Sequence, residues 1–212
     1  MDHDNIRIEI LTARIAMEDY LRDYVDVPRF LGLCAQCSNY DNRWSCPPFD
    51  FDPLDHLKQF SAVRVVARKV SPIGDWRFGA NPAEPAADPT PESPSAPAQG
   101  PTFTGENAEN YDHVWQMLST VKADLEAELF RMEEQFPGSR LLSGGSCYKC
   151  NQGCTRPAGL PCRHPEMMRY SIEALGGDVE KIAADLLDSP LIWSKAGELP
   201  PYYMLVGGLL LK

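Results

Sequence analysis

The chain has 212 residues, a hydrophobic fraction of 43% and a formal net charge of −10. This length suits a single domain with an ordinary hydrophobic core. The acidic balance argues against a nucleic-acid-binding protein, because such proteins need a basic face that displaces counterions from phosphates.

The N-terminal stretch MDHDNIRIEI lacks the basic region and apolar block of a secretory signal. No apolar run approaches the roughly 18 residues of a membrane-spanning helix, so we predict no membrane partner. We therefore expect a cytoplasmic protein in a reducing compartment, where stable disulfides are rare. In that setting the seven cysteines are better explained as metal ligands or redox thiols.

The N-terminal third is predicted to contain two strands and a short helix. Ile6–Ile10 alternates apolar and polar residues within an apolar stretch that extends to Ala16, which is typical of a strand. Glu18–Tyr24 is expected to be a short helix and the β-branched segment Ala62–Val70 a second strand. Between them, a segment punctuated by Gly, Asn and Pro is expected to be a loop that carries Cys34, Cys37 and Cys46.

A change of composition marks an insertion between Pro72 and Asn107. This segment is dominated by Pro, Ala and Ser with acidic residues. It cannot bury enough apolar surface to offset the entropy cost of ordering, so we predict a flexible insertion over residues 72–107. A loop elaboration without a function of its own is the simplest interpretation, and a tether for a partner protein is the alternative.

The longest predicted helix is Tyr111–Phe136, which the Pro-Gly pair that follows it should end. Apolar residues recur in it at steps of three and four, which places them along one face. We expect this stripe to be a core face, made of Val114, Leu118, Val121, Leu125, Leu129, Met132 and Phe136.

Four further elements are predicted after this helix. Ser139–Ser143 is expected to be a strand that leads into a second group of cysteines. Pro165–Leu175 is predicted to be a helix, because Pro suits the first turn and the glycine pair that follows suits the end. Asp178 should cap another helix that runs to about Leu187, and Tyr202–Leu211 should be a final strand.

Strands and helices follow in mixed order without a regular alternation. This order is typical of the α+β fold class. We therefore predict one compact α+β domain formed by residues 1–71 and 108–212, with the cysteines in irregular loops that a metal pins.

The second cysteine group has the pattern Cys147-x2-Cys150-x3-Cys154-x7-Cys162. A Cys-x2-Cys spacing lets two thiolates reach one ion from a tight turn, and four thiolates complete a site. The uneven spacing differs from a zinc ribbon, which pairs two Cys-x2-Cys units, and iron–sulfur clusters tolerate it. We predict an iron–sulfur cluster of the [4Fe–4S] type, with zinc as the alternative.

The first group has the pattern Cys34-x2-Cys37-x8-Cys46 and contains three cysteines. The Cys-Pro step at its end also occurs in bacterial ferredoxins. Three interpretations stay open. A further residue supplies a fourth ligand, with His56 and His113 as weak candidates; an iron–sulfur cluster keeps one open iron; or the other group completes a zinc site.

Two alternatives without metal also exist for the thiols. A disulfide framework is disfavoured by the compartment and by the odd number of cysteines. A Cys-x2-Cys thiol–disulfide exchanger does not need a third and fourth cysteine close behind the first pair. Metal ligation is therefore the favoured interpretation.

Several phrases of the sequence resemble those of a known family. CSNYDNRWSCPPFDFDP, CYKCNQGC, PCRHPEMMRYSIEALGGDV and the apolar C-terminal strand are similar to a family of prokaryotic proteins described as predicted metal-binding proteins, a domain of unknown function. The resemblance covers most of the chain outside the insertion. It implies metal binding through the cysteines, all seven of which are present, and it implies no particular reaction, substrate or metal.

Basic residues gather around the second cysteine group of this acidic chain. Charge compensation is the simpler interpretation, because four thiolates on a zinc ion or cluster leave a negative charge. The sharper alternative is a pocket for a small anion at Arg163 and His164, where the helix predicted from Pro165 would point its N–H groups and could present Ser171 and Glu173. The basic residues are Lys149, Arg156, Arg163, His164 and Arg169.

Three functions from different classes follow. The leading one is an iron–sulfur protein with a redox or accessory role and a redox partner protein. The second is a zinc-stabilised interaction module. The third is an enzyme that uses an open iron held by the first cysteine group as a Lewis acid. The sequence has no phosphate loop and no dinucleotide-binding fingerprint.

Overall fold

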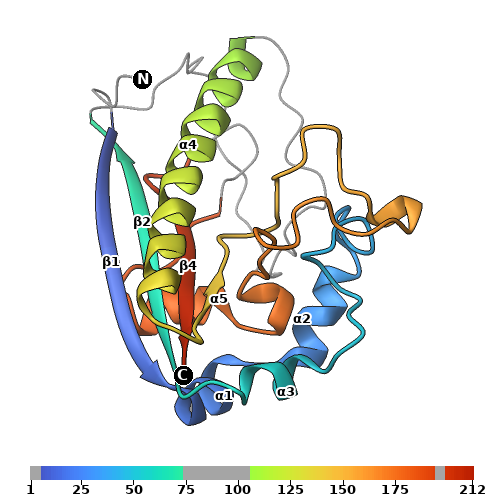
Figure 1. The fold of residues 1–212 in the computed structure, drawn as a ribbon. Coiled ribbons are helices and arrows are strands. Elements are labelled where there is room, and N and C mark those ends of the chain that lie inside the picture. Colours follow the sequence, from blue (N-terminus) through green and yellow to red (C-terminus); the bar gives the residue numbers. More distant parts are fainter. Residues whose placement is uncertain (1–5, 74–105, 194–198) are drawn as a thin grey trace.

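A four-stranded antiparallel sheet lies at the centre of the molecule (Figure 1). The structure is a computed structural model that describes residues 6–73, 106–193 and 199–212, with the backbone alone for residues 106–113. The strand order is β1-β2-β4-β3. The strands are β1 (Ile6–Ala16), β2 (Ala62–Pro72), β3 (Arg140–Leu142) and β4 (Tyr203–Leu211).

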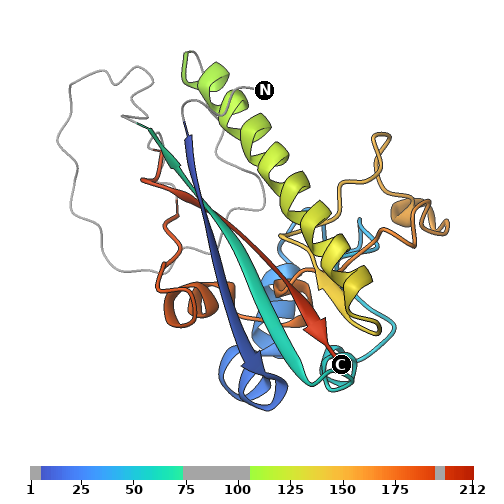
Figure 2. The ribbon, with the colours of Figure 1, turned by 60° about the vertical axis from the view of Figure 1, so that its left-hand side comes forward.

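Strand β2 is the most buried part of the sheet, because both of its faces are covered. Val63 and Val65 belong to the core cluster that includes helix α1 (Met17–Tyr24) and helix α5 (Val179–Asp185). Val66 and Val70 belong to the clusters on the opposite face, which include helix α4 (Glu106–Gln135). The sheet therefore separates one long helix from a layer of short ones (Figures 1 and 2).

The apolar stripe of α4 packs on the sheet as predicted. Five of its residues are buried, with exposed fractions between 0% and 7%. Met132 is partly buried, and Phe136 lies after the last turn of the helix and is 43% exposed. The helix begins five residues before the predicted start. The buried residues are Val114, Leu118, Val121, Leu125 and Leu129.

The other predicted strands are also present, and α1 and α5 are the short helices that the sequence predicts after the first strand and after Asp178. The first strand extends over the whole stretch to Ala16, and the short strand is β3. Helix α5 starts after Asp178, whose carboxylate accepts a hydrogen bond from the Lys181 N–H at 3.0 Å. The fold class predicted from the sequence, α+β, is confirmed.

Two short helices were absent from the sequence prediction. Helix α2 (Val27–Cys34) begins where the Asp26 carboxylate accepts a hydrogen bond from the Arg29 N–H. Helix α3 (Pro53–Leu57) begins in the same way at Asp52. Both starts combine a capping aspartate with a proline in the first turn, a sequence signal that is typical of helix N-termini.

The helix predicted over Pro165–Leu175 is wrong. Residues 165–167 form a turn, Ser171 forms an isolated bridge with Ser143, and only Glu173–Leu175 is helical, as a short 3-10 helix η2. The Ser143 N–H donates to the Tyr170 carbonyl at 2.8 Å. The segment is extended here because its backbone pairs with the chain that leaves β3, and this tertiary pairing overrides the local helix signals.

Most of the predicted insertion, residues 74–105, lies outside the described residues. At its edges, β2 continues to Pro72 and α4 already starts at Glu106, so both flanking elements extend slightly into the predicted insertion. Among the described residues, no helix combines the length and the apolar character needed to cross a membrane.

Truncating the buried stripe of α4 should destabilise the protein strongly. Leu129 is fully buried between α4 and the sheet, so Leu129→Ala is expected to lower the free energy of unfolding by about 3 kcal/mol. Phe136→Ala removes a half-exposed ring and should cost less than about 1 kcal/mol. Urea denaturation of both variants measures this difference, and equal losses would contradict the packing described.

Candidate metal centre

The first cysteine group is built on the end of helix α2 and the turns that follow it. Cys34 is the last residue of α2. The Cys37 N–H donates to the Cys34 carbonyl at 2.9 Å, and the Cys46 N–H donates to the Arg43 carbonyl at 3.0 Å. The end of α2 and these local turns position the three thiols.

The second cysteine group lies on an irregular segment next to the first. Gly153 has a φ of 80°, a left-handed conformation that glycine adopts without strain, and it allows the tight turn between Cys150 and Cys154. The cavity that the segment encloses is small, about 10 Å³, which is the space of roughly one water molecule. All cysteines of this group line it, namely Cys147, Cys150, Cys154 and Cys162.

Backbone N–H groups point at the sulfur atoms of three cysteines. In each case the donor is the amide two residues further along the chain. Such N–H···S contacts stabilise a thiolate and are common around metal-bound cysteines. The pairs are Asn39 to Cys37 at 3.5 Å, His164 to Cys162 at 3.4 Å, and Lys149 to Cys147.

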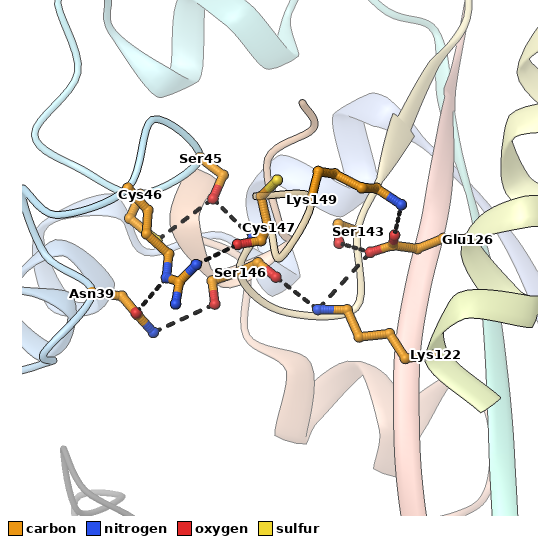
Figure 3. Close-up of polar contacts among 10 residues, drawn as sticks. Asn39, Ser45, Cys46, Lys122, Glu126, Ser143, Ser146, Cys147 and Lys149 are labelled. Carbon is orange, nitrogen blue, oxygen red and sulfur yellow. Dashed lines mark hydrogen bonds and ion pairs between the residues drawn. The ribbon is translucent and has the colours of Figure 1, made fainter. Parts of the chain in front are cut away.

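A buried serine joins the two cysteine groups (Figure 3). The Ser45 hydroxyl accepts a hydrogen bond from the Cys147 N–H at 3.0 Å and lies 3.8 Å from the Cys46 sulfur. Beside it, the Arg43 guanidinium donates to the Cys147 carbonyl at 2.7 Å. Both polar groups of the Cys147 backbone are thus held by side chains from the first group.

Helix α4 anchors the start of the second segment. The Lys122 ammonium donates to the Ser146 carbonyl at 2.7 Å (Figure 3). Glu126, one turn further along, is buried and accepts hydrogen bonds from the Lys149 ammonium at 2.8 Å and the Ser143 hydroxyl at 2.6 Å. The polar side of α4 therefore fixes residues on both sides of Cys147.

Arg156 forms a second clamp between the groups. Its side chain is 10% exposed and forms an ion pair with Asp41 at 3.1 Å. Its guanidinium also donates to backbone carbonyls of the first segment, at Arg43, Cys46 and Pro48. The Arg43 carbonyl also accepts the Cys46 N–H of the local turn. Because a loop lacks the regular partners of a helix or sheet, one arginine from the second segment supplies the further donors.

The thiols are free, and the environments of three of them favour the protonated form. All seven cysteines are unpaired; Cys37 is exposed and the others are half-buried. Burial, with contributions from Cys46, Glu173 and Cys37, raises the pKa of Cys34 to about 11. Burial also raises the pKa values of Cys46 and Cys147. Metal ligation would compete with these protons, since the thiolate is the ligand form.

The residues present fit a thiolate-bound metal or cluster in their chemistry. Four thiols line one cavity, three more lie beside it, and N–H donors already face the sulfur atoms. In the described part of the chain, however, no group of three or more His, Cys, Asp or Glu side chains is already arranged to hold a metal ion.

Two histidines, His56 and His113, were proposed as a fourth ligand of the first group, and the structure describes the side chain of His56. His56 packs among aromatic rings, with Phe51 at 5.3 Å and Tyr170 at 5.9 Å between ring centroids. Burial lowers its pKa. The side chain of His113 lies outside the described residues. His56 is thus accounted for by packing with its aromatic neighbours.

The basic residues near the second group all have partners within the chain. Arg163 donates to the Gly153 carbonyl at 2.8 Å, and Arg169 forms an ion pair with Glu133 at 2.8 Å. His164 lines the cysteine cavity and lies 4.0 Å from Glu166. The helix N-terminus expected to bind an anion beside Arg163 and His164 does not exist, because residues 165–167 form a turn. An anion at these residues stays a prediction without that support.

Ser171 and Glu173, predicted to lie on that helix, occupy other positions. Ser171 is buried, and its hydroxyl accepts a hydrogen bond from the Ala174 N–H at 3.2 Å. Glu173 begins η2, and burial raises the pKa of its carboxyl group. The sequence analysis missed Ser45 and Glu126. Nothing in the sequence around either residue indicates its partners, which lie elsewhere in the chain.

The comparisons with known proteins give one match. The sequence model of a family described as "Predicted metal-binding protein (DUF2284)" matches residues 21–211. The matched range includes both cysteine groups and every element from α2 to β4. Searches of curated proteins and of solved structures found no match.

Removing the Arg156 clamp should loosen the first cysteine segment. Arg156→Met keeps the bulk of the side chain and removes the guanidinium donor from three carbonyls, of which that of Arg43 keeps the Cys46 N–H. Hydrogen bonds to charged groups contribute about 1.5–3 kcal/mol, so amide exchange over residues 39–48 should accelerate roughly tenfold or more. Hydrogen–deuterium exchange measures this rate.

Arg163→Met is the matched control, because this guanidinium donates to a single carbonyl within its own segment. It should leave exchange over residues 39–48 unchanged. Equal acceleration in both variants would show that Arg156 has no special part in joining the segments.

Proposed function

Because the chain belongs to the predicted metal-binding protein family DUF2284, we propose that it is an iron–sulfur protein with a redox or accessory role. The observation that carries this proposal is the convergence of Cys147, Cys150, Cys154 and Cys162 on one cavity. Four thiolates are the usual ligand set of such clusters. The cluster, when bound, supplies a site for one-electron transfer.

The protein's own contribution is to orient the thiolates and to tune their charge. The N–H donors at Asn39, Lys149 and His164 stabilise negative charge on sulfur. Arg43 fixes the backbone of Cys147, and the ammonium of Lys149 brings positive charge beside it. Hydrogen bonds and nearby charge of this kind are the means by which a protein adjusts the reduction potential of a cluster.

The first group is proposed to hold a second, separate centre. The cavity is lined by the four cysteines of the second group and by none of the first, which supports a separate centre for Cys34, Cys37 and Cys46. Ser45 lies between the groups and touches both. Two neighbouring centres suit a protein that passes electrons to a partner. A Lewis-acid role for an open iron at the three-cysteine group is the enzymatic version of the same proposal.

A zinc-stabilised module is the second candidate, and the size of the cavity favours it. A space of about 10 Å³ suits a single ion, whereas a four-iron cluster requires the segment 147–162 to move outward. Structural zinc is bound by four thiolates in a closed tetrahedral site. In this case the metal would stabilise the irregular segments and supply no redox chemistry.

Single cysteine variants should separate the two centres. We expect protein purified without air to be brown and to contain iron and acid-labile sulfide. Cys154→Ser should remove the share of iron bound by the second group, and Cys37→Ser the share bound by the first, each leaving the other share in place. Iron and sulfide analysis with visible spectroscopy measures both shares.

Either of two outcomes would contradict the proposal. Colourless protein with stoichiometric zinc would leave the structural module as the function. Loss of all iron in each single variant would mean that the seven cysteines hold one shared centre.

A further inference from the structure

We propose that the free edge of strand β1 pairs with β1 of a second copy of this chain, in an antiparallel register centred on Ile8. The proposal is independent of the metal chemistry. Strand β3, which leads into the second cysteine group, lies at the opposite edge of the sheet from β1 (Figures 1 and 2). A dimer formed through β1 would therefore leave the cysteine-bearing segments accessible.

The first observation is a long strand edge without a partner. Strand β1 comes first in the order β1-β2-β4-β3, and in the described part of the chain it pairs with β2 alone. This pairing runs from Ile6 opposite Pro72 to Ala16 opposite Ala62 without a bulge, and β1 contains neither proline nor glycine. In an antiparallel sheet, alternate residues of an edge strand direct their N–H and C=O groups outward. Such an edge is a template for a further strand.

The second observation is an exposed apolar row on one face of β1. Ile6, Ile8 and Ile10 alternate with charged residues and therefore share a face of the strand. Ile6 packs against the cluster that includes α4, whereas Ile8 is 37% exposed and Ile10 is 61% exposed. A two-fold axis normal to the sheet keeps equivalent faces on the same side, so a second copy would place its own isoleucines against this row.

The third observation is a pair of opposite charges on the other face. Arg7 and Glu9 are exposed and, within the described residues, neither forms an ion pair. Inside the sheet Glu9 lies opposite Lys69, whose ammonium instead donates to the Ser189 hydroxyl at 3.2 Å. If Ile8 lies opposite Ile8 of the second copy, Arg7 lies opposite Glu9 at two places in the dimer. Opposite charges at directly opposed positions stabilise strand pairs, and like charges destabilise them.

The charges distinguish this register from its neighbours. Opposed residues in an antiparallel pair point to the same face, so each alternative symmetric register is centred on another residue of the strand. Centring on Arg7 or on Glu9 sets like charges opposite each other, and centring on Ile10 sets Glu9 opposite Leu11. The sequence Ile-Arg-Ile-Glu-Ile at residues 6–10 is thus complementary to itself in one register. This self-complementarity identifies a second copy as the partner.

Protection of the edge is the alternative role of these charges. Charged side chains on an edge strand often keep other chains away. Protection works with any sign and spacing, whereas the pairing needs opposite signs at two positions that flank an isoleucine. Arg7 and Glu9 on either side of Ile8 meet this stricter condition.

Sedimentation equilibrium of the full-length protein, purified without air and kept with a thiol reductant, tests the pairing. The wild type should show a monomer–dimer equilibrium that the reductant does not abolish. Arg7→Glu makes residues 7 and 9 both acidic, and Glu9→Arg makes both basic, so each variant opposes like charges in its own dimer. We expect each substitution to raise the dimer dissociation constant roughly tenfold or more.

An equimolar mixture of these two variants separates a broken contact from a misfolded strand. In the mixed dimer the acidic positions of one copy face the basic positions of the other, so association should return at least to the wild-type level. The double substitution of Arg7→Glu with Glu9→Arg should restore it as well. Local misfolding of a variant would not be rescued by either combination.

Arg14→Glu is the matched control, because Arg14 is exposed on the same strand, lies outside residues 6–10, and changes the net charge as Arg7→Glu does. It should associate like the wild type. A wild type that stays monomeric up to about 0.1 mM, where even a weak dimer is populated, would overturn the inference. A dimer unaffected by Arg7→Glu and Glu9→Arg, a mixture without rescue, or equal weakening by Arg14→Glu would also overturn it.

Discussion

The candidate site depends on hydrogen bonds to the backbone N–H and C=O groups of two irregular segments. These segments carry all seven cysteines, and neither belongs to the sheet. A loop whose N–H and C=O groups lack regular partners needs side chains to supply them. Arg156 does so for the first segment, and Ser45 and Arg43 do so for the second. Each segment is therefore ordered by the other.

The sheet and its helices contribute by fixing the ends of these segments. Helix α2 ends at Cys34, and the short strand β3 leads to Ser143, whose hydroxyl bonds to Glu126 of α4. The core thus determines where each segment starts, and the clamps determine how the two meet. This division resembles that of many binding proteins, in which a rigid scaffold positions functional loops.

Periodicity in the sequence was sufficient to predict the sheet and the long helix α4, but not the short helices α2 and α3. The stripe of Leu125 and Leu129 and the β-branched residues of β2 report burial directly, and the α+β class followed from their order. The helix predicted from Pro165 failed because the backbone near Ser171 pairs with Ser143, a partner far away in the sequence. Local signals carry no information about such a partner.

The same limit applies to the site. Cysteine spacing identified the thiols that line the cavity, because ligand spacing is a local property. It did not identify Ser45, and it named Arg156 as a basic residue of the second group without its partners in the first, which lie about a hundred residues away. Long-range polar contacts of this kind have no signature in a single sequence.

Native mass spectrometry of the wild-type protein, purified without air, tests the central claim most directly. The account of two neighbouring thiol groups with separate centres predicts a main species that carries two iron–sulfur cofactors, together with a species that carries one. A protein that carries a single cofactor and never two would contradict separate centres. A protein that carries zinc ions alone would contradict the redox role and leave a metal-stabilised structural module.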